Sequence, residues 1–216
     1  MARKTKQQAE ETRQEILDAA IKTFSERGVS ATSLADIAKA AGVTRGAIYW
    51  HFKNKVDLFY QACEFGDNQI VQAEEYYRSK YTNDPLSILR ELLVYILTDF
   101  IESPKNRALM EIFFLKCELV GEMAELVDFK RANYVASQCR IVDNFTACID
   151  AGQLPADLDV ECAAIMIRSL MSGLLENWLL QSENFNINQH TITLVDTLLE
   201  TLKCNTAIRL KPIQTE

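Results

Sequence analysis

The chain has 216 residues, of which 48% are hydrophobic and 25% are charged, and its formal net charge is −7. This composition allows a substantial buried core in one or two domains, and only 7 Gly and 4 Pro argue against a turn-rich all-β protein. The first residues, MARKTKQQAEETRQ, lack the apolar centre of a secretory signal, and the most apolar stretch contains Arg168, Glu176 and Asn177. We therefore expect a cytoplasmic protein without a membrane span.

The cysteines and histidines give no indication of a metal or redox centre. The six cysteines form no CxxC pair, and neither His51 nor His190 has a ligand-type partner three or four residues away. We expect reduced thiols, and neither a metal site nor a cofactor. A redox-sensing thiol is the alternative, although none of the cysteines lies in an evidently basic segment.

The net charge conceals a difference between the two ends of the chain. Residues 1–55 contain ten Lys or Arg and six Asp or Glu, whereas the remaining residues contain thirteen and twenty-four. A positive N-terminal segment on an acidic protein indicates a small surface that faces a polyanion. Chance clustering of surface charge is the alternative unless a motif supports the interpretation.

The first two predicted elements are amphipathic helices in the segments 12–28 and 31–42. The first places Ile16, Leu17, Ala20, Ile21 and Phe24 on one stripe and ends at Gly28. The second begins at Ser33, with Asp36 three residues later as in a capping box, and ends at Gly42. A third helix follows from Arg45 to Phe52, capped by Thr44. Two short helices joined by a glycine turn predict a helix-turn-helix.

The third helix carries the row Tyr49, Trp50, His51 and Phe52. Ile48 and Phe52 are four residues apart and can pack on the first two helices, which leaves the other ring-bearing side chains facing outward. Arg45 can donate a bidentate pair to guanine, Gly46 allows close approach, and the neighbouring side chains can reach phosphates or thymine methyls. The predicted DNA contacts are Thr32, Ser33, Thr44, Arg45, Gly46, Tyr49, Trp50, His51 and Lys55. An ordinary three-helix subdomain with an exposed aromatic face is the alternative.

The stretch TSLADIAKAAGVTRGAIYWHFKNKVDLF at 32–59 resembles the DNA-binding signature of the TetR family. The segments MARKTKQQAEETR, GVTRGAIYWHF, KCELVGEM and LPADL resemble the branch of that family that represses multidrug efflux pumps. The resemblance extends from the first residue to about Leu202. It implies a repressor of an efflux-pump operon that is released by hydrophobic or amphipathic drugs, dyes or bile salts.

The remainder of the chain predicts helices over 55–81, 86–102, 105–118, 122–151, 158–181 and 189–203. Asn54 is expected to cap the first of these, with Asp57 at its third position. The expected fold is all-α, with about nine helices: a three-helix head on a helical ligand-binding and dimerisation body. We predict a DNA-binding domain at 1–55, a ligand-binding and dimerisation domain at 56–204, and a tail at 205–216.

The resemblance implies a drug pocket enclosed by the middle helices. Met residues and rings adapt to varied apolar shapes, which suits such a pocket. The predicted lining is Asp67, Ile70, Met110, Phe114, Ser137, Gln138, Ile141, Arg168 and Met171. For any one Met or Phe, the alternative to ligand binding is ordinary helix packing. For Arg168 and Gln138, the alternative is a surface position or a satisfied polar contact.

The last two predicted helices carry broad apolar faces that suit a homodimer about a twofold axis. The predicted interface residues are Leu170, Leu174, Trp178, Val195, Leu198 and Leu202. A monomer could instead bury both faces against its own middle helices. A twofold dimer matches a palindromic operator in double-stranded DNA, so this prediction agrees with the DNA-binding prediction.

Three function classes follow from these patterns. A ligand-controlled repressor accounts for the head, the body and the dimer together. A DNA-binding regulator controlled by a protein partner is the alternative, and it would bind its operator regardless of small molecules. An enzyme is disfavoured, because the chain has no glycine-rich phosphate loop, no G-x-S-x-G motif and no histidine pair.

Overall fold

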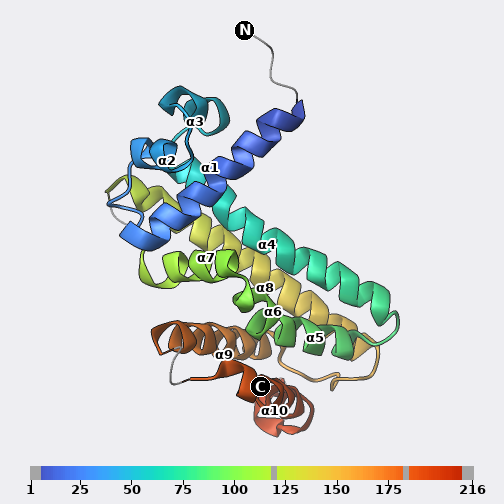
Figure 1. Ribbon diagram of the computed structural model, residues 1–216. Helices are drawn as coiled ribbons and strands as arrows, with labels where there is room; N and C mark the ends of the chain where they lie inside the picture. Colours follow the sequence, from blue (N-terminus) through green and yellow to red (C-terminus); the bar gives the residue numbers. More distant parts are fainter. Residues whose placement is uncertain (1–5, 118–120, 182–184, 211–216) are drawn as a thin grey trace, which may run out of the picture. The chain divides into compact units, whose positions relative to one another are not determined.

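The computed structural model describes residues 6–117, 121–181 and 185–210 (Figure 1). The MARKTKQQAEETR and KCELVGEM segments and the predicted tail therefore lie partly outside the described residues. The secondary-structure elements of the described residues are helices, which confirms the all-α prediction, and α6 is a single turn. The α-helices are α1 (Lys6–Arg27), α2 (Leu34–Ala40), α3 (Arg45–His51), α4 (Lys55–Lys80), α5 (Pro85–Leu97), α6 (Asp99–Glu102), α7 (Pro104–Leu115), α8 (Leu126–Asp150), α9 (Val160–Leu180) and α10 (Ile187–Cys204).

The described residues form two compact units. The first comprises Met1–Gln69 and Glu102–Arg131, and the second comprises Ile70–Ile101 and Ala132–Glu216. Helices α4 and α8 each contribute residues to both units. The predicted boundaries at 55 and 204 stay predictions, since a division by contacts does not delimit functional domains.

The first unit is built on one face of α1, which packs against α2 and α7. The stripe predicted for this helix is fully buried, from Ile16 to Phe24, and the Phe24 ring meets the Phe59 ring of α4 edge to face at 6.1 Å. Helix α7 adds Leu109 and Ile112 to the same core. Burying each large aliphatic or aromatic side chain contributes about 1.5–3 kcal/mol, so this shared core stabilises the packing of the helices in the first unit.

Side-chain caps define the short helices of the head. Ser33 caps α2 and accepts from the backbone N–H of Asp36, while the Asp36 carboxylate accepts from the backbone N–H of Ser33 at 3.0 Å. Gly42 takes a φ of 66° in the turn, and Thr44 caps α3. Asn54 accepts from the backbone N–H of Asp57 at 2.7 Å. The capping residues predicted from the sequence are all confirmed, and they hold two seven-residue helices that propensity alone would not stabilise.

The second unit contains α5, α9 and α10, and α10 packs against the other two helices. Arg90 of α5 and Asp196 of α10 form a paired hydrogen-bonded ion pair, with Nε–Oδ1 at 2.6 Å and Nη2–Oδ2 at 3.0 Å. In the same unit, Arg78 of α4 donates to Asn144 of α8 at 2.8 Å. Hydrogen-bonded polar pairs thus connect α5 with α10 and α4 with α8 in this unit.

The first helix begins at Lys6, six residues before its predicted start, and two further predicted helices also differ in their bounds. The helix expected over 86–102 breaks at Thr98, whose backbone takes a non-helical φ of −127° and ψ of −92°. The start of the helix expected over 122–151 is instead a 3₁₀ segment, Gly121–Glu125. Part of the predicted tail folds: the backbone N–H of Leu210 donates to Asp157 at 2.7 Å, and Ile208 is buried.

The predicted dimer surface is largely occupied within the chain itself. Trp178, Val195, Leu198 and Leu202 are buried in the single protomer, while Leu170 and Leu174 are partly exposed. Helix α10 packs against α5 and α9. The exposed apolar side chains of these helices are different ones: Ile165, Leu180 and Ile192.

Candidate nucleic-acid interface and ligand-binding residues

Helix α3 has one buried side and one exposed side. Ile48 and Phe52 are fully buried, whereas Tyr49 is 48% and Trp50 is 71% exposed. The His51 ring lies against the Trp50 ring, with centroids 4.4 Å apart and planes nearly perpendicular. An exposed Trp supported by a second ring has no packing role in this unit, so the aromatic surface of α3 is available to a partner.

Arg45 and Tyr49 lie one helical turn apart on the exposed side of α3. The Arg45 Nη2 donates to the Tyr49 hydroxyl at 3.2 Å, and the guanidinium carbon lies 5.6 Å from the centre of the Tyr49 ring. This hydrogen bond raises the pKa of Arg45 above its ordinary value. The tyrosine therefore restricts a charged side chain at the start of the helix, where a base edge would approach.

These side chains border a groove of about 580 Å³ in the first unit. Its walls come from the α1–α2 connection, the start of α2, the exposed side of α3 and the start of α4. The lining residues are Ser30, Ala31, Thr32, Ser33, Leu34, Ala35, Arg45, Tyr49, Asn54 and Lys55. The lining includes five of the predicted DNA contacts: Thr32, Ser33, Arg45, Tyr49 and Lys55.

Two predicted DNA contacts point into the protein. Lys55 is only 7% exposed, and its Nζ donates to the carbonyls of Val29 at 3.0 Å, Thr32 at 3.0 Å and Ser30 at 3.4 Å. The Thr32 side chain is buried and its hydroxyl donates to the Gly28 carbonyl at 2.7 Å. An ammonium has three N–H donors, and three carbonyls surround this one. The phosphate contact expected of Lys55 is therefore corrected to a structural role, and Thr32 likewise has its side chain inside.

The other predicted DNA contacts remain on the surface. Ser33, Thr44 and Gly46 are exposed and His51 is partly exposed. The hydroxyls of Ser33 and Thr44 accept the capping hydrogen bonds from Asp36 and Ala47. Both caps also lie at helix N-termini, where backbone N–H groups and the helix dipole attract phosphate.

The predicted ligand-binding residues divide between the two units. The first unit contains Asp67, Met110 and Phe114, and the second contains Ile70, Ser137, Gln138, Ile141, Arg168 and Met171. Of these nine, Met171 is the buried one and the others are partly exposed. Their role in binding a drug stays a prediction.

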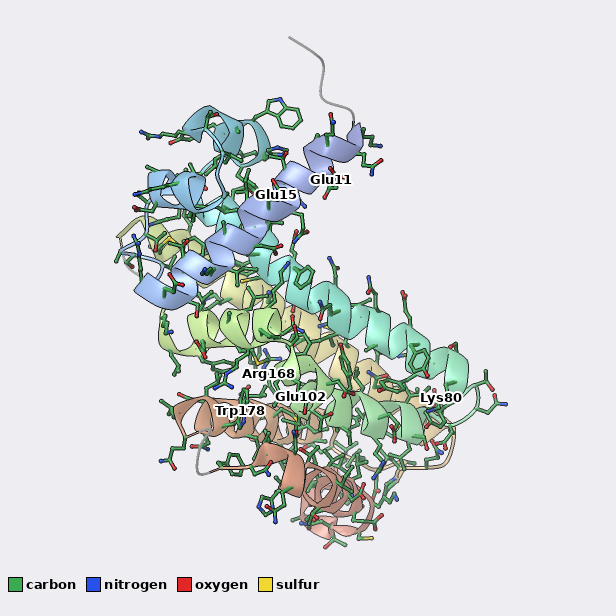
Figure 2. The ribbon with its side chains drawn as sticks, viewed as in Figure 1. Glu11, Glu15, Lys80, Glu102, Arg168 and Trp178 are labelled. Carbon is green, nitrogen blue, oxygen red and sulfur yellow. The ribbon has the colours of Figure 1, made fainter. Side chains whose placement is uncertain are left out.

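Three side chains of α8 and α9, Tyr134, Ser137 and Arg168, form a polar cluster within the second unit. The Arg168 guanidinium lies 4.0 Å from the centre of the Tyr134 ring and donates to the Ser137 hydroxyl. Gln138, on the next position of α8, has a buried Oε1 that accepts no hydrogen bond from the described part of the chain. Arg168 and Trp178 of α9 are labelled in Figure 2. A cation, a ring and an unsatisfied acceptor together are more than helix packing requires.

The described residues contain no group of His, Cys, Asp and Glu that could hold a metal ion, and no helix among them is long and apolar enough to cross a membrane. Burial raises the pKa of the Cys63 thiol, and of Cys117, and it raises that of Cys148 to about 11. These three thiols are therefore poor nucleophiles at neutral pH.

Family models match both parts of the chain. The model for bacterial regulatory proteins of the tetR family matches residues 16–62, and the model for the C-terminal region of MAATS-type transcriptional repressors matches residues 84–204. The HTH-type transcriptional regulator AcrR of Shigella flexneri is 50% identical over 200 residues, which are 93% of each chain. The chain belongs to the TetR family. It is a DNA-binding transcriptional regulator and not an enzyme, as the sequence predicted.

Solved structures of family members have the same fold over head and body. NalD, the secondary repressor of the MexAB-OprM multidrug efflux pump in Pseudomonas aeruginosa, is 30% identical with a TM-score of 0.78, covering 93% of this chain and 100% of that one. SmeT in complex with triclosan is 27% identical with a TM-score of 0.80, covering 95% and 98%. SmeT represses the Stenotrophomonas maltophilia multidrug efflux pump SmeDEF.

Sequence analysis missed two features of this TetR-family protein. Tyr134 was not among the predicted ligand residues, although its spacing of three and four residues from Ser137 and Gln138 places all three on one side of a helix. The second feature is a bridge from α7 to α1, in which Lys116 Nζ donates to the Ser25 carbonyl at 2.6 Å and lies 3.3 Å from Glu111. Nothing in the local sequence signals a contact between residues this far apart.

Proposed function

We propose that this protein is a ligand-responsive repressor of a multidrug efflux pump operon, acting in the cytoplasm. The observation that carries the proposal is the extent of the likeness to AcrR, which covers the body as well as the head at 50% identity. A shared head alone would support DNA binding without indicating what controls it. NalD and SmeT, both repressors of such pumps, match over nearly the whole chain and support the same function.

The DNA contacts in this proposal come from the exposed side of α3 and from the two helix N-termini beside it. Arg45 reads a guanine edge, Tyr49 and Trp50 contact phosphates or thymine methyls, and the capped N-termini at Ser33 and Thr44 hold backbone phosphates. The buried Lys55 ammonium stabilises the α1–α2 connection by donating hydrogen bonds to its backbone carbonyls. Cationic and aromatic groups on one exposed side, as at Arg45, Tyr49 and Trp50, support this assignment.

A palindromic operator requires two heads, so we propose a homodimer. The surface that supports it is a stripe on α9 with exposed Ile165, Ser169 and Leu180 and partly exposed Gly173, together with exposed Ile192 of α10. A Cβ built at Gly173 would meet no atom within 4 Å, so the chain itself does not need the glycine for packing. A second copy of the chain that packs closely against α9 would require a glycine at this position.

The proposed control runs along α4. This helix is continuous from Lys55, which holds the head, through Asp67 and Ile70, two of the predicted ligand residues. A ligand that displaces α4 would change the separation of the two recognition helices, which must match major grooves about 34–36 Å apart or a related multiple. Effective release requires the ligand to prefer the non-binding shape by about 1–3 kcal/mol or more.

The test is fluorescence anisotropy with labelled DNA from upstream of this protein's own gene and of its neighbours, with and without ethidium, rhodamine or a bile salt. We expect salt-sensitive, sequence-specific binding that at least one compound releases. Tight binding that no compound disturbs would support control by a protein partner instead. No binding to any of these fragments would contradict the operator assignment.

A further inference from the structure

The polar cluster on α8 and α9 has a positive charge that no carboxylate of the described residues neutralises. Arg168 is half-buried, its guanidinium lies over the Tyr134 ring, and Ser137 accepts a hydrogen bond from its Nη1. Among the residues that the structure describes, no carboxylate pairs with Arg168. Buried or half-buried arginines ordinarily have such a partner, because removing a charge from water costs free energy that a counter-ion offsets.

The electrostatic surroundings add to this imbalance. Burial lowers the pKa of Arg168 below its ordinary value, and the nearby Arg140 contributes in the same direction, while Tyr134 opposes them. Two guanidiniums from α8 and α9 therefore make the local potential positive, in a body whose overall charge is negative.

The hydrogen-bonding groups that remain define what would fit. A guanidinium has five N–H donors in a planar fork, and the described residues accept from one side of it, at Nη1. One turn from Tyr134 along α8, the buried Gln138 Oε1 is an acceptor without a donor. The cluster thus offers a cationic fork, a ring to pack against, and an acceptor for a hydroxyl or N–H group.

We propose that Arg168, Tyr134, Ser137 and Gln138 form a subsite for a planar aromatic anion, a ligand with an ionised acid group at one end and a hydrogen-bond donor at the other. The acid group pairs with the free edge of the Arg168 fork, the ring stacks beside the guanidinium, and the donor reaches Gln138 Oε1. The proposal rests on the proposed function, since it names one chemical class of inducer for the same regulator. Neutral apolar compounds would gain nothing from this subsite.

The test compares a matched pair of probes on the full-length protein. The probes are 6-hydroxy-2-naphthoate and its neutral amide, 6-hydroxy-2-naphthamide, which share ring and hydroxyl and differ in charge. Binding to the free protein is measured by calorimetry, for the wild type, Arg168→Gln and Lys80→Gln. Lys80 is the matched control, because it is another cation of the second unit over a tyrosine ring, 4.9 Å from the centre of Tyr81. Thermal unfolding of each variant confirms that it folds.

We expect the naphthoate to bind the wild type at least about tenfold more tightly than the amide, as a charge-assisted pair would give. Arg168→Gln should remove that preference, and Lys80→Gln should retain it. Arg168→Lys, which keeps the charge and loses the planar fork, should keep part of it. Substituting Gln138 by Leu should weaken both probes by a similar factor, because both carry the hydroxyl.

Equal affinity for the two probes in the wild type, or a preference that survives in Arg168→Gln, would overturn the subsite. Absence of binding by both probes would overturn it as well. The proposed function is judged separately, by release of operator DNA with ethidium, rhodamine or a bile salt. A protein released by those compounds but indifferent to the naphthoate is a ligand-controlled repressor without this subsite.

Discussion

Two basic residues of the head, Arg45 and Lys55, have opposite surroundings. Arg45 is exposed and restrained by the Tyr49 hydroxyl at 3.2 Å, whereas the Lys55 ammonium is enclosed by the carbonyls of Val29, Ser30 and Thr32. A planar fork suits the reading of a base edge, and a compact ammonium suits a cluster of carbonyls. Their substitutions should therefore have different consequences.

Arg45→Ala should weaken operator binding by about 1–3 kcal/mol and relax the base preference at one position of each half-site. Anisotropy titrations against the operator and a set of single-base variants measure both effects. Tyr49→Phe is the control, since it removes the hydroxyl that restrains Arg45 and keeps the ring. A uniform loss across all variants would mean that Arg45 contacts phosphate and does not read a base.

Lys55→Met should lower the free energy of unfolding of the head by about 1–3 kcal/mol, because three carbonyls lose their donor in a buried site. Urea denaturation measures this loss. The dependence of operator affinity on salt concentration should stay that of the wild type, since no phosphate contact is removed. A normal stability combined with a salt slope reduced by about one would restore the phosphate contact that the sequence suggested.

At the scale of the elements, helix starts are set by side chains that accept backbone N–H groups. Asp84 caps α5 ahead of Pro85, and Ser103 caps α7 ahead of Pro104. Asp159 caps α9, and Asn186 caps α10. These residues are strong N-cap formers, and proline fits the first helical turn, where no N–H donor is needed.

Asp84 supports a prediction about acid stability. Its carboxylate accepts from Ser87 Oγ at 2.5 Å, Gln153 Nε2 at 2.6 Å and the Ser87 backbone N–H at 3.0 Å, and these hydrogen bonds lower the pKa of Asp84. A lowered folded-state pKa contributes stability that is present above the ordinary value of about 3.9 and is lost as the pH falls through the folded-state value.

Asp84→Ala should therefore lower the free energy of unfolding by about 0.5–2 kcal/mol at neutral pH, the usual effect of losing a cap. The difference from the wild type should shrink as the pH falls from about 4 through the lowered folded-state pKa of Asp84, because the folded carboxylate becomes protonated only there. Denaturation series at several pH values measure it. Asp84→Asn, which keeps capping ability without ionisation, is the control, and a difference independent of pH would contradict the assignment.

Local chemistry explains which parts of the fold could be predicted. Caps at Ser33, Thr44 and Asn54, and the buried pair Ile48 and Phe52, depend on neighbours within one turn, and the sequence contains those neighbours. The exposed rings of α3 followed from the same periodicity. Lys55 could not be predicted, because its partners belong to the distant α1–α2 connection. The break at Thr98 has no local signal in the sequence, because Thr23 and Thr191 make the same hydroxyl bond to their own helices without ending them.

The same limit applies to the last helices. An apolar stripe predicts that a helix face is buried, but it does not show which helix or subunit covers that face. Trp178, Val195, Leu198 and Leu202 pack within the protomer, and this choice depends on the tertiary arrangement of α5, α9 and α10. The pair of Arg168 with Tyr134 likewise joins two helices that the sequence could not set side by side.

At the scale of the whole molecule, the proposed dimer makes a prediction at Gly173. Gly173→Gln should shift the dimer toward monomer in analytical ultracentrifugation, because a long side chain would occupy the surface on which the second copy sits. The protomer should not lose stability, since a Cβ at this position meets open space and glycine is about 1 kcal/mol less favourable than alanine in a helix. Gly173→Ala is the control for helix propensity. A variant that remains as dimeric as the wild type would exclude this stripe from the interface.

The charge distribution also belongs to the whole molecule. The head is positive and the rest of the chain is negative, so the operator attracts one part of the protein and repels the other. A regulator with this distribution orients itself on DNA before specific contacts form. Control by a ligand then requires that the bound compound and the bound operator oppose each other through the protein.

That opposition is the central claim, and one measurement tests it most directly. The dissociation constant of a releasing compound is determined by calorimetry for the free repressor and for the repressor saturated with operator DNA. The account predicts that the compound binds the free form at least about fivefold more tightly, since coupling free energies of about 1–3 kcal/mol correspond to this range and above. Equal affinity for the two forms would contradict it, because a ligand that does not distinguish them cannot move the equilibrium.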